Sequence, residues 1–218
     1  MAGEQKEEEH DKGFHVPMPA WFYDSIVFVF TLGRESRQRK EILDIAMIQP
    51  NERVLDVGCG TGTLAIMAAD DSGARRIVGV DPDPKMIQRA SKKAGENRTN
   101  LHFSVGECQS LKMDDASFEL ILTTFTLHHM PGGETQRKCL SEMKRVLVPG
   151  GRLLLVDFAG GHGHHHHVNP CQLFCGAHEN ENASNDPMVG LLEQAGFENV
   201  SAQSIRMLGA VAVLAYNP

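Results

Sequence analysis

The length, composition and charge of the chain indicate a single globular domain and exclude several other classes of protein. Its 218 residues suffice for one domain with a sizeable core, and 41% of them are hydrophobic, as in ordinary globular proteins. With 21 basic and 28 acidic residues, the formal net charge of −7 argues against non-specific nucleic-acid binding and against a basic membrane-binding patch.

The N-terminal region predicts a flexible tail followed by helices. The absence of a secretory signal and the cysteine content together predict a protein of the cytoplasm. Residues 1–15 are rich in Glu and Lys and lack apolar periodicity, so we expect a flexible acidic tail and no secretory signal. A helix is expected over 21–32, which is too short to span a membrane, and a second over 35–47. The five cysteines, an odd number, are not expected to form a disulfide framework.

The most informative stretch is Arg-Val-Leu-Asp-Val-Gly-Cys-Gly-Thr-Gly, at residues 53–62. Its apolar, β-branched start predicts a buried strand, and the Ala- and Leu-rich segment 63–70 predicts a helix. Between them, glycines at every second position predict a tight turn whose backbone can approach a ligand closely. This G-x-G-x-G spacing differs from the G-x-G-x-x-G of dinucleotide-binding folds.

The remaining elements alternate between strands and helices. Strands are expected at 76–81, 101–105, 118–123 and 152–157, and helices at 84–94 and 134–147, with Pro149-Gly150-Gly151 as a turn. A helix capped by Asp186 and two strands, 198–206 and 210–216, complete the chain. The right-handed crossover rule makes the sheet parallel except for this last hairpin.

A carboxylate stands at the end of the second strand. Asp81 lies 19 residues after Gly62 (81 − 62), where an acidic side chain can accept hydrogen bonds from both hydroxyls of a ribose. Pro82 and Asp83 open the next helix, so Asp81 could instead be an ordinary helix cap.

These motifs resemble those of the Rossmann-like, class I S-adenosylmethionine-dependent methyltransferases. Asp56-x-Gly58-x-Gly60-x-Gly62 is similar to their first motif. Trp-Phe-Tyr-Asp at 21–24, Leu-His-His-Met at 127–130 and Val-Leu-Val-Pro-Gly-Gly at 146–151 resemble the branch that contains quinone-biosynthesis and other small-molecule methyltransferases. The resemblance covers residues 20–158 well and the last thirty loosely.

The resemblance implies a Rossmann-like three-layer α/β sandwich over residues 16–218. Its seven-stranded, mostly parallel sheet would carry a C-terminal antiparallel hairpin, with helices at the N-terminal side. It also implies S-adenosylmethionine as methyl donor, S-adenosylhomocysteine as product, a small-molecule acceptor that the motifs do not name, and a monomer or homodimer.

The resemblance further implies a donor site along the strand ends. Gly106-Glu107-Cys108 stands where the family usually has Gly-Asp-Ala against the adenine, and Tyr23 would cover the methionine end. The candidate donor-binding residues are Tyr23, Asp56, Gly58, Cys59, Gly60, Thr61, Gly62, Asp81, Pro82, Met86, Gly106, Glu107, Cys108, Thr123 and Leu127.

His128 and His129 are the candidate catalytic residues. Methyl transfer is an in-line displacement, in which the protein mostly aligns the reactants and excludes water. A base is needed only if the acceptor keeps its proton at neutral pH, and histidine titrates near that pH. The alternative is that both side chains hold the loop and line the pocket.

A His/Cys-rich insert at about 159–185 interrupts the family pattern. His164, His166, Cys171, Cys175 and His178 are candidate ligands for zinc, nickel or copper. Three readings stay open: a polar loop that binds metal weakly, a specific metal site, or thiols that bind the acceptor, as in arsenite methyltransferases.

Two further function classes compete with a methyltransferase of ordinary small molecules. A non-catalytic donor- and metal-binding protein would bind donor without releasing S-adenosylhomocysteine. A dinucleotide oxidoreductase is disfavoured by the glycine spacing and by the Gly-Glu-Cys turn.

Overall fold

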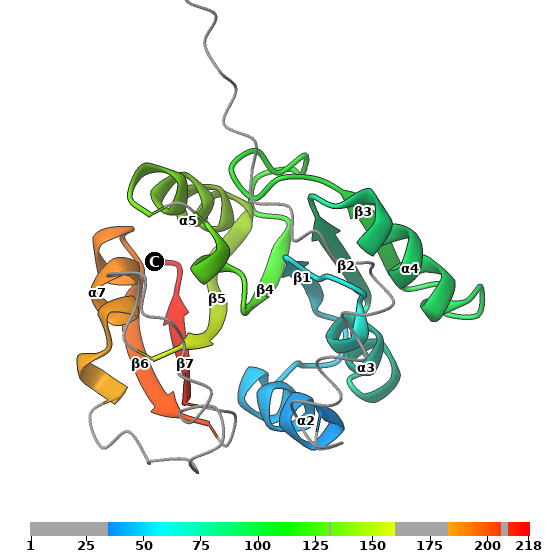
Figure 1. Ribbon diagram of the computed structural model, residues 1–218, viewed down its shortest axis with the longest axis horizontal. Helices are drawn as coiled ribbons and strands as arrows, with labels where there is room; N and C mark the ends of the chain where they lie inside the picture. The colour runs from blue at the N-terminus through cyan, green and yellow to red at the C-terminus, as the bar shows by residue number, and fades with distance from the viewer. Residues whose placement is uncertain (1–34, 131, 160–182, 206–208) are drawn as a thin grey trace, which may run out of the picture.

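One twisted sheet organises the described part of the chain in the computed structural model (Figure 1). The structure describes residues 35–130, 132–159, 183–205 and 209–218. The expected tail, the helix expected at 21–32, the donor candidate Tyr23 and residues 160–182 of the insert lie outside the described residues.

The helices and strands follow the order that the sequence predicts. They are α2 (Glu35–Ala46), β1 (Arg53–Val57), α3 (Thr63–Asp71), β2 (Arg76–Asp81), α4 (Pro84–Ala94), β3 (Leu101–Val105), β4 (Phe118–Thr124), the 3₁₀ turn η1 (Leu127–His129), α5 (Glu134–Val146), β5 (Leu147–Phe158), the 3₁₀ turn η2 (Ala183–Asn185), α7 (Pro187–Gln194), β6 (Glu198–Ser204) and β7 (Ala210–Tyr216).

The sheet has the predicted seven strands, in the order β3-β2-β1-β4-β5-β7-β6. β1 to β5 pair in parallel, whereas β7 pairs antiparallel with both β5 and β6. The strand order reverses between β1 and β4, and open α/β sheets bind ligands outside the carboxyl ends of strands at such a switch point. The topology therefore directs attention to the carboxyl ends of β1, β2, β4 and β5.

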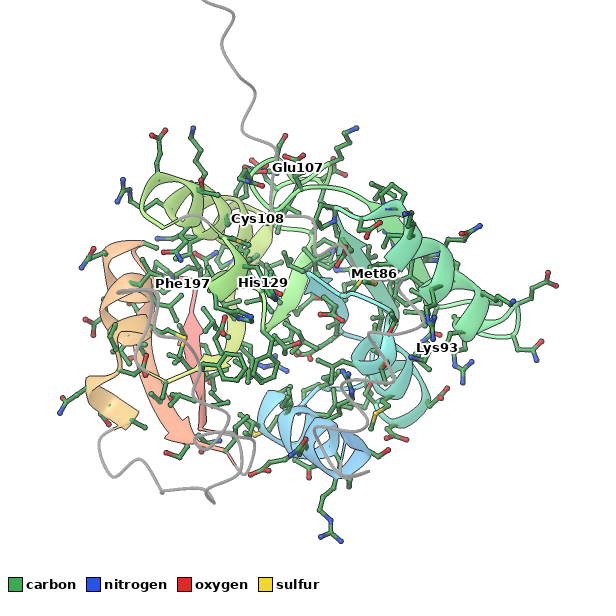
Figure 2. All side chains as sticks on the ribbon, viewed as in Figure 1. Met86, Lys93, Glu107, Cys108, His129 and Phe197 are labelled. Carbon is green, nitrogen blue, oxygen red and sulfur yellow. A yellow bond between two sulfur atoms is a disulfide. The ribbon has the colours of Figure 1, made fainter. Side chains whose placement is uncertain are left out.

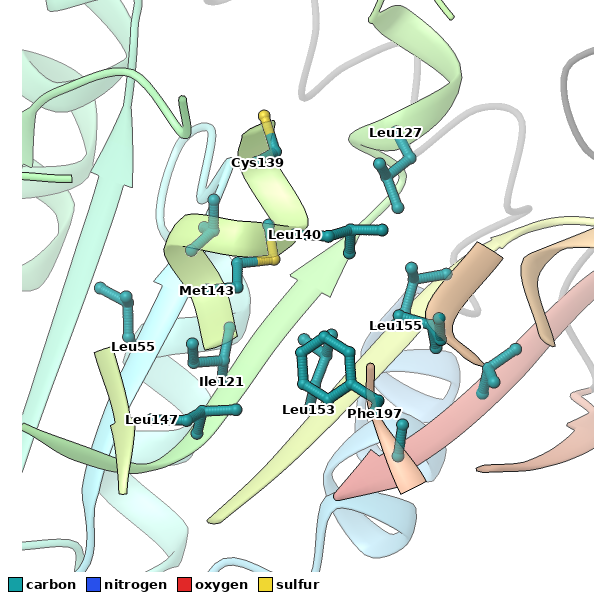
Figure 3. Close-up of a cluster of buried hydrophobic side chains, with 14 of the residues drawn as sticks. Leu55, Ile121, Leu127, Cys139, Leu140, Met143, Leu147, Leu153, Leu155 and Phe197 are labelled. Carbon is teal, nitrogen blue, oxygen red and sulfur yellow. The ribbon is translucent and has the colours of Figure 1, made fainter. Parts of the chain in front are cut away.

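Helices cover both faces of the sheet, so the expected three layers are confirmed. One face packs against α5 and α7, and its cluster includes Leu55, Leu140 and Leu192 (Figure 3). The other face packs against α2 and α3, with Val54, Ile42 and Leu64 in contact. Because the central strands are buried on both faces, they appear in the sequence as apolar runs rather than alternating patterns.

The strand expected at 152–157 starts earlier than predicted, because β5 begins directly after α5 and includes Pro149-Gly150-Gly151. Leu147 pairs with Phe118 and Arg152 with Leu120, so the register shifts and residues 148–151 stand opposite Glu119 alone. Gly150 adopts a φ of 75°, a left-handed conformation that glycine adopts without strain. Pairing with β4 resumes at Arg152, beyond this irregular segment.

Arg152 fastens α2 to the sheet. Its guanidinium donates to both carboxylate oxygens of Glu52, at 2.7 and 2.9 Å, and to the carbonyl oxygens of Ala46 and Met47 at the end of α2, at 2.9–3.1 Å. The two side chains are only 13% and 14% exposed. A nearly buried ion pair of this kind leaves an uncompensated charge when one partner is removed.

We expect Arg152→Met to lower the free energy of unfolding by about 3 kcal/mol, because Glu52 and the end of α2 lose their donors. Urea denaturation of both proteins measures the difference. Lys40→Met is the matched control: Lys40 pairs with Asp44 on the surface, where the side chains are 67% and 64% exposed, and should change stability by less than about 0.5 kcal/mol. Equal stability of Arg152→Met and wild type would contradict this role.

Candidate functional site

The glycine turn after β1 is tied to the end of β2. The backbone N–H groups of Gly58 and Cys59 both donate to the carbonyl oxygen of Val80, at 2.8 and 3.1 Å. A Cβ on Gly58 would collide with the side chain of Thr126, in the loop after β4. On Gly60, by contrast, a Cβ would meet none of the described atoms within 4 Å. The turn is therefore packed at its start and open at its centre, where a ligand can approach the backbone.

Asp81 links this turn to the helix that follows β2. Its Oδ2 atom accepts from the N–H of Gly60 and its Oδ1 atom from the N–H of Asp83, both at 2.9 Å. Burial raises the pKa of the Asp81 carboxyl. The helix cap of α4 is Asp83, whose side chain accepts from Lys85 N at 2.8 Å, so the alternative that Asp81 is the cap is wrong.

Asp56 is a buried carboxyl that lacks a hydrogen-bond partner among the described residues. It is 1% exposed, and neither of its oxygens is paired there. Burial raises its pKa to about 7, the positive charge of Arg39 opposes the rise, and the charge of Asp81 adds to it. On the neighbouring β4, the buried hydroxyl of Thr123 is also unpaired within the described part. Unpaired buried polar groups are costly, so both indicate a binding partner at this edge.

The other candidates in the turn are engaged within the protein. Burial raises the pKa of the Cys59 thiol, which keeps it protonated, and its Sγ lies 3.8 Å from the carbonyl oxygen of Gly60. The Thr61 hydroxyl accepts from Nζ of Lys93 on α4, at 3.3 Å. Gly62 contacts Phe103, whose ring lies 2.5 Å from where a Cβ would stand.

Two donor candidates lie after β2. Pro82 is exposed. Met86 on α4 (Figure 2) is half-buried.

The loop after β3 meets the same edge. Gly106 N donates to the carbonyl oxygen of Asp81 at 3.1 Å, and Glu107 extends outward as an exposed side chain (Figure 2). Val105, which pairs in register with Asp81, is 50% exposed. The sequence analysis missed Val105, whose only signal is an apolar residue at a strand end.

Cys108 forms a disulfide with Cys139 of α5. Met130 lies against both, with its Sδ 3.8 Å from Cys108 Sγ and 3.5 Å from Cys139 Sγ. The expectation that the cysteines form no disulfide framework is wrong for this pair. The bond joins the predicted adenine-side loop to α5, 31 residues further along the chain.

His128 and His129 lie at the carboxyl end of β4, in η1. The ring Nδ1 of His128 is 2.7 Å from Oδ1 of Asp157 at the end of β5. The two histidine rings are in contact, with centroids 3.8 Å apart and planes tilted by 44°. Burial, and then the charge of His128, lower the pKa of His129. Leu127 is 2% exposed and its side chain packs in the core. If Leu127 contacts the methyl donor, the contact must therefore come from its backbone.

Two aromatic rings lie at this end of the sheet, and one of them contacts His128. Phe125 and Phe158 lie with centroids 5.1 Å apart, and Phe158 is 41% exposed and packs edge-on against His128. Phe125 has a φ of 52°, which a bulky side chain rarely adopts. Such strain is often found at functional sites, and here the strained residue is the first of the loop after β4.

The five predicted metal ligands of the insert lie outside the described residues. Within the ranges that the structure describes, no group of three or more His, Cys, Asp or Glu side chains could hold a metal ion. The same ranges contain no helix with the length and apolar character needed to cross a bilayer.

Comparison with known proteins identifies the family. A family model described as a methyltransferase domain matches residues 54–151, which include the glycine turn, Asp81 and both histidines. An uncharacterised methyltransferase of Synechocystis is 33% identical over 187 residues, 81% of this chain and 82% of that protein. The chain belongs to the class I methyltransferase family.

Two further relatives are named as demethylmenaquinone methyltransferases. A demethylmenaquinone methyltransferase of Thermus thermophilus is 31% identical over 136 residues, which make up 62% of this chain. This chain spans 60% of that protein's length and 55% of the Deinococcus radiodurans relative. A crystal structure of an S-adenosylmethionine-dependent methyltransferase from Aquifex aeolicus has a TM-score of 0.62 at 20% identity, covers 83% of this chain and 89% of that one, and shares the fold.

We expect reduction of the disulfide to lower the free energy of unfolding by about 3 kcal/mol, because the bond closes a loop of 31 residues in the unfolded chain. Peptide mapping without reductant should recover a cross-link between Cys108 and Cys139. The stability of the Cys139→Ser control should not respond to dithiothreitol. Alkylation of both thiols in unfolded, unreduced protein would contradict the pairing.

Proposed function

We propose that this chain transfers the methyl group of S-adenosylmethionine to a small-molecule acceptor. The observation that carries the proposal is the pair of carboxyl groups, Asp56 and Asp81, on either side of an open glycine turn at the switch point of the sheet. Membership of the methyltransferase family supports it.

The residues present fit the donor. Asp81 keeps acceptor capacity beyond its two backbone bonds, which suits the hydroxyls of a ribose. Asp56 and Thr123 have buried oxygens without described partners, which suits a positively charged amino group. Val105 offers an exposed apolar side chain near Asp81 for the adenine. When bound, the donor supplies a methyl group already activated on a sulfonium.

The acceptor is proposed to lie beside the histidines. The names of the relatives suggest a reduced naphthoquinone ring as the first compound to test. The rings of Phe125 and Phe158 support a planar, apolar acceptor there. The metal- or metalloid-linked alternative has no support from the described residues and is not part of the proposal. We further propose a monomer or homodimer.

The decisive experiment combines binding and turnover. Titration calorimetry with S-adenosylhomocysteine tests the donor site, and mass spectrometry tests methyl transfer to reduced 1,4-naphthoquinone and to a panel of phenols, thiols and amines. Stoichiometric binding with methylation of one class supports the proposal. Absence of binding would overturn it, whereas binding without turnover on any acceptor would favour a non-catalytic donor-binding protein.

We expect Asp81→Asn to weaken S-adenosylhomocysteine binding by about 10- to 100-fold, because hydrogen bonds to a charged acceptor contribute about 1.5–3 kcal/mol. Calorimetry on the folded variant gives the affinity. Asp83→Asn is the matched control, since it lies two residues away and caps α4. Unchanged affinity in Asp81→Asn would remove this residue from the donor site.

We expect S-adenosylhomocysteine to bind more weakly as pH falls from 7.5 to 5.5. The Asp56 carboxyl, with a pKa of about 7, must lose its proton before it can pair with the ligand's ammonium group, which stays protonated over this range. Below pH 7 the affinity should therefore fall by up to about tenfold per pH unit. Calorimetry on Asp56→Asn should show weaker binding without this pH dependence, and a pH-independent wild type would contradict the assignment.

A further inference from the structure

Asp157 is a buried carboxylate to which the sequence analysis gave no function. It lies at the end of β5 and is 3% exposed. Three hydrogen-bond donors converge on it. Its Oδ2 atom accepts from the backbone N–H of His128 at 3.1 Å, and its Oδ1 atom accepts from Phe158 N at 2.8 Å and lies 2.7 Å from Nδ1 of His128.

These three hydrogen bonds to Asp157 determine which ring nitrogen of His128 carries the proton. The two backbone groups can only donate, and each occupies one carboxylate oxygen. An ionised carboxylate only accepts, so the 2.7 Å contact requires a proton on Nδ1. In a neutral imidazole the other nitrogen, Nε2, is then the acceptor.

The same contacts separate the two histidines that the sequence left as equal candidates. The ring of His129 has no hydrogen-bond partner among the described residues, and burial lowers its pKa. Its ring packs against His128 in a tilted arrangement, at a centroid distance of 3.8 Å. The Phe158 ring packs edge-on against His128 at 5.1 Å. His128 is thus the oriented histidine, and its neighbours hold the ring in place.

His128 is positioned beside the proposed donor site. It follows Thr126 by two residues, and the Thr126 side chain fills the space that a Cβ on Gly58 would need. Thr126 Oγ1 also lies 3.4 Å from the carbonyl oxygen of Val57, at the end of β1. The His128 side chain is 27% exposed, so a ligand can reach it.

We propose that Asp157 is a positioning residue that makes Nε2 of His128 the base for an acceptor that carries a proton on or next to its attacking atom. His128 takes that proton, and the resulting imidazolium is paired with Asp157. The freed electron pair of the acceptor forms the bond to the methyl group, and the electron pair of the broken carbon–sulfur bond stays on the donor's sulfur. This inference rests on the proposed function.

The chemistry of the site calls for a carboxylate here. An asparagine at position 157 has one accepting oxygen and one donating NH₂ group. In one orientation its oxygen accepts from the backbone N–H of His128. Its NH₂ group then faces the N–H of Phe158, which is also a donor. The same NH₂ group can bond to Nδ1 of His128 only if Nδ1 accepts, so the ring proton moves to Nε2. If its oxygen faces Phe158 N, its NH₂ group opposes the backbone N–H of His128. Asp157→Asn therefore tests the role with almost no change of side-chain volume.

The test is a long-range ¹H–¹⁵N NMR spectrum of the protein labelled with ¹⁵N-histidine, at a pH where His128 is neutral. The His128 signal is assigned by its loss in His128→Gln. We expect the Nδ1–H form in wild type and a shift toward the Nε2–H form in Asp157→Asn. An Nε2–H form in wild type would overturn the inference.

Asp186→Asn is the matched control for loss of a buried carboxylate. Asp186 is 6% exposed and caps α7, where it accepts from Met188 N at 2.9 Å. This variant should leave the His128 signal unchanged. If Asp186→Asn moved the signal as much as Asp157→Asn does, the effect would be general to the fold and the inference would fail.

Binding and turnover separate this inference from the proposed function. Asp157→Asn should keep S-adenosylhomocysteine affinity within about twofold of wild type. With whichever acceptor of the panel is methylated, kcat should fall by roughly 10²- to 10⁴-fold, as for loss of a general base. Failure of wild type to bind S-adenosylhomocysteine would refute the proposed function, whereas normal binding with unchanged kcat in Asp157→Asn would refute only the role of Asp157.

Discussion

The close approach of the glycine turn to the loop after β4 is the constraint on which the site depends. Gly58 leaves no room for a Cβ beside Thr126, and its φ of 76° is costly for other residues. The parallel pairing of β1 with β4 ends at Val57 and Thr123, and this contact continues it into the two loops at the switch point of the sheet. It therefore sets the distance between the proposed donor site, on the turn, and the histidines of η1. A side chain at position 58 would disturb both at once.

Three buried or half-buried carboxyl groups meet this edge, and their hydrogen bonds assign them different tasks. Asp157 has three donors from the protein, so its charge is compensated in the folded chain. Asp81 has two backbone donors and retains acceptor capacity. Asp56 has none among the described residues, and its pKa rises to about 7. The least satisfied group has the most to gain from a cationic ligand, and the most satisfied one is suited to hold a side chain in place.

The features that the sequence predicts correctly are local in the chain. The glycine turn, the strand that ends at Asp81 and the cap at Asp186 each depend on residues within a few positions of one another. The final hairpin also follows from alternating and apolar runs on either side of Gly209. The largest error in an element boundary is also local, since β5 begins at Leu147 and continues through Pro149-Gly150-Gly151 with a shift in register.

The features that the sequence could not predict join distant residues. Cys108 and Cys139 are 31 positions apart, and no spacing rule pairs two of five cysteines. Asp157 lies 29 positions after His128 and resembles any polar residue at a strand end. Only the pairing of β4 with β5 places the two side by side.

The pairing of β4 with β5 also explains why one histidine is oriented and the other is packed. Thr124 of β4 pairs with Val156 of β5, so the chain after β4 begins beside the residue that precedes Asp157. Phe125 continues this contact by donating its N–H to the carbonyl oxygen of Val156 at 2.8 Å, in the strained conformation that turns the loop. The loop then returns His128, through both its backbone and its ring, to the Asp157 carboxylate. The strain at Phe125 is thus tied to the geometry that gives His128 its carboxylate partner.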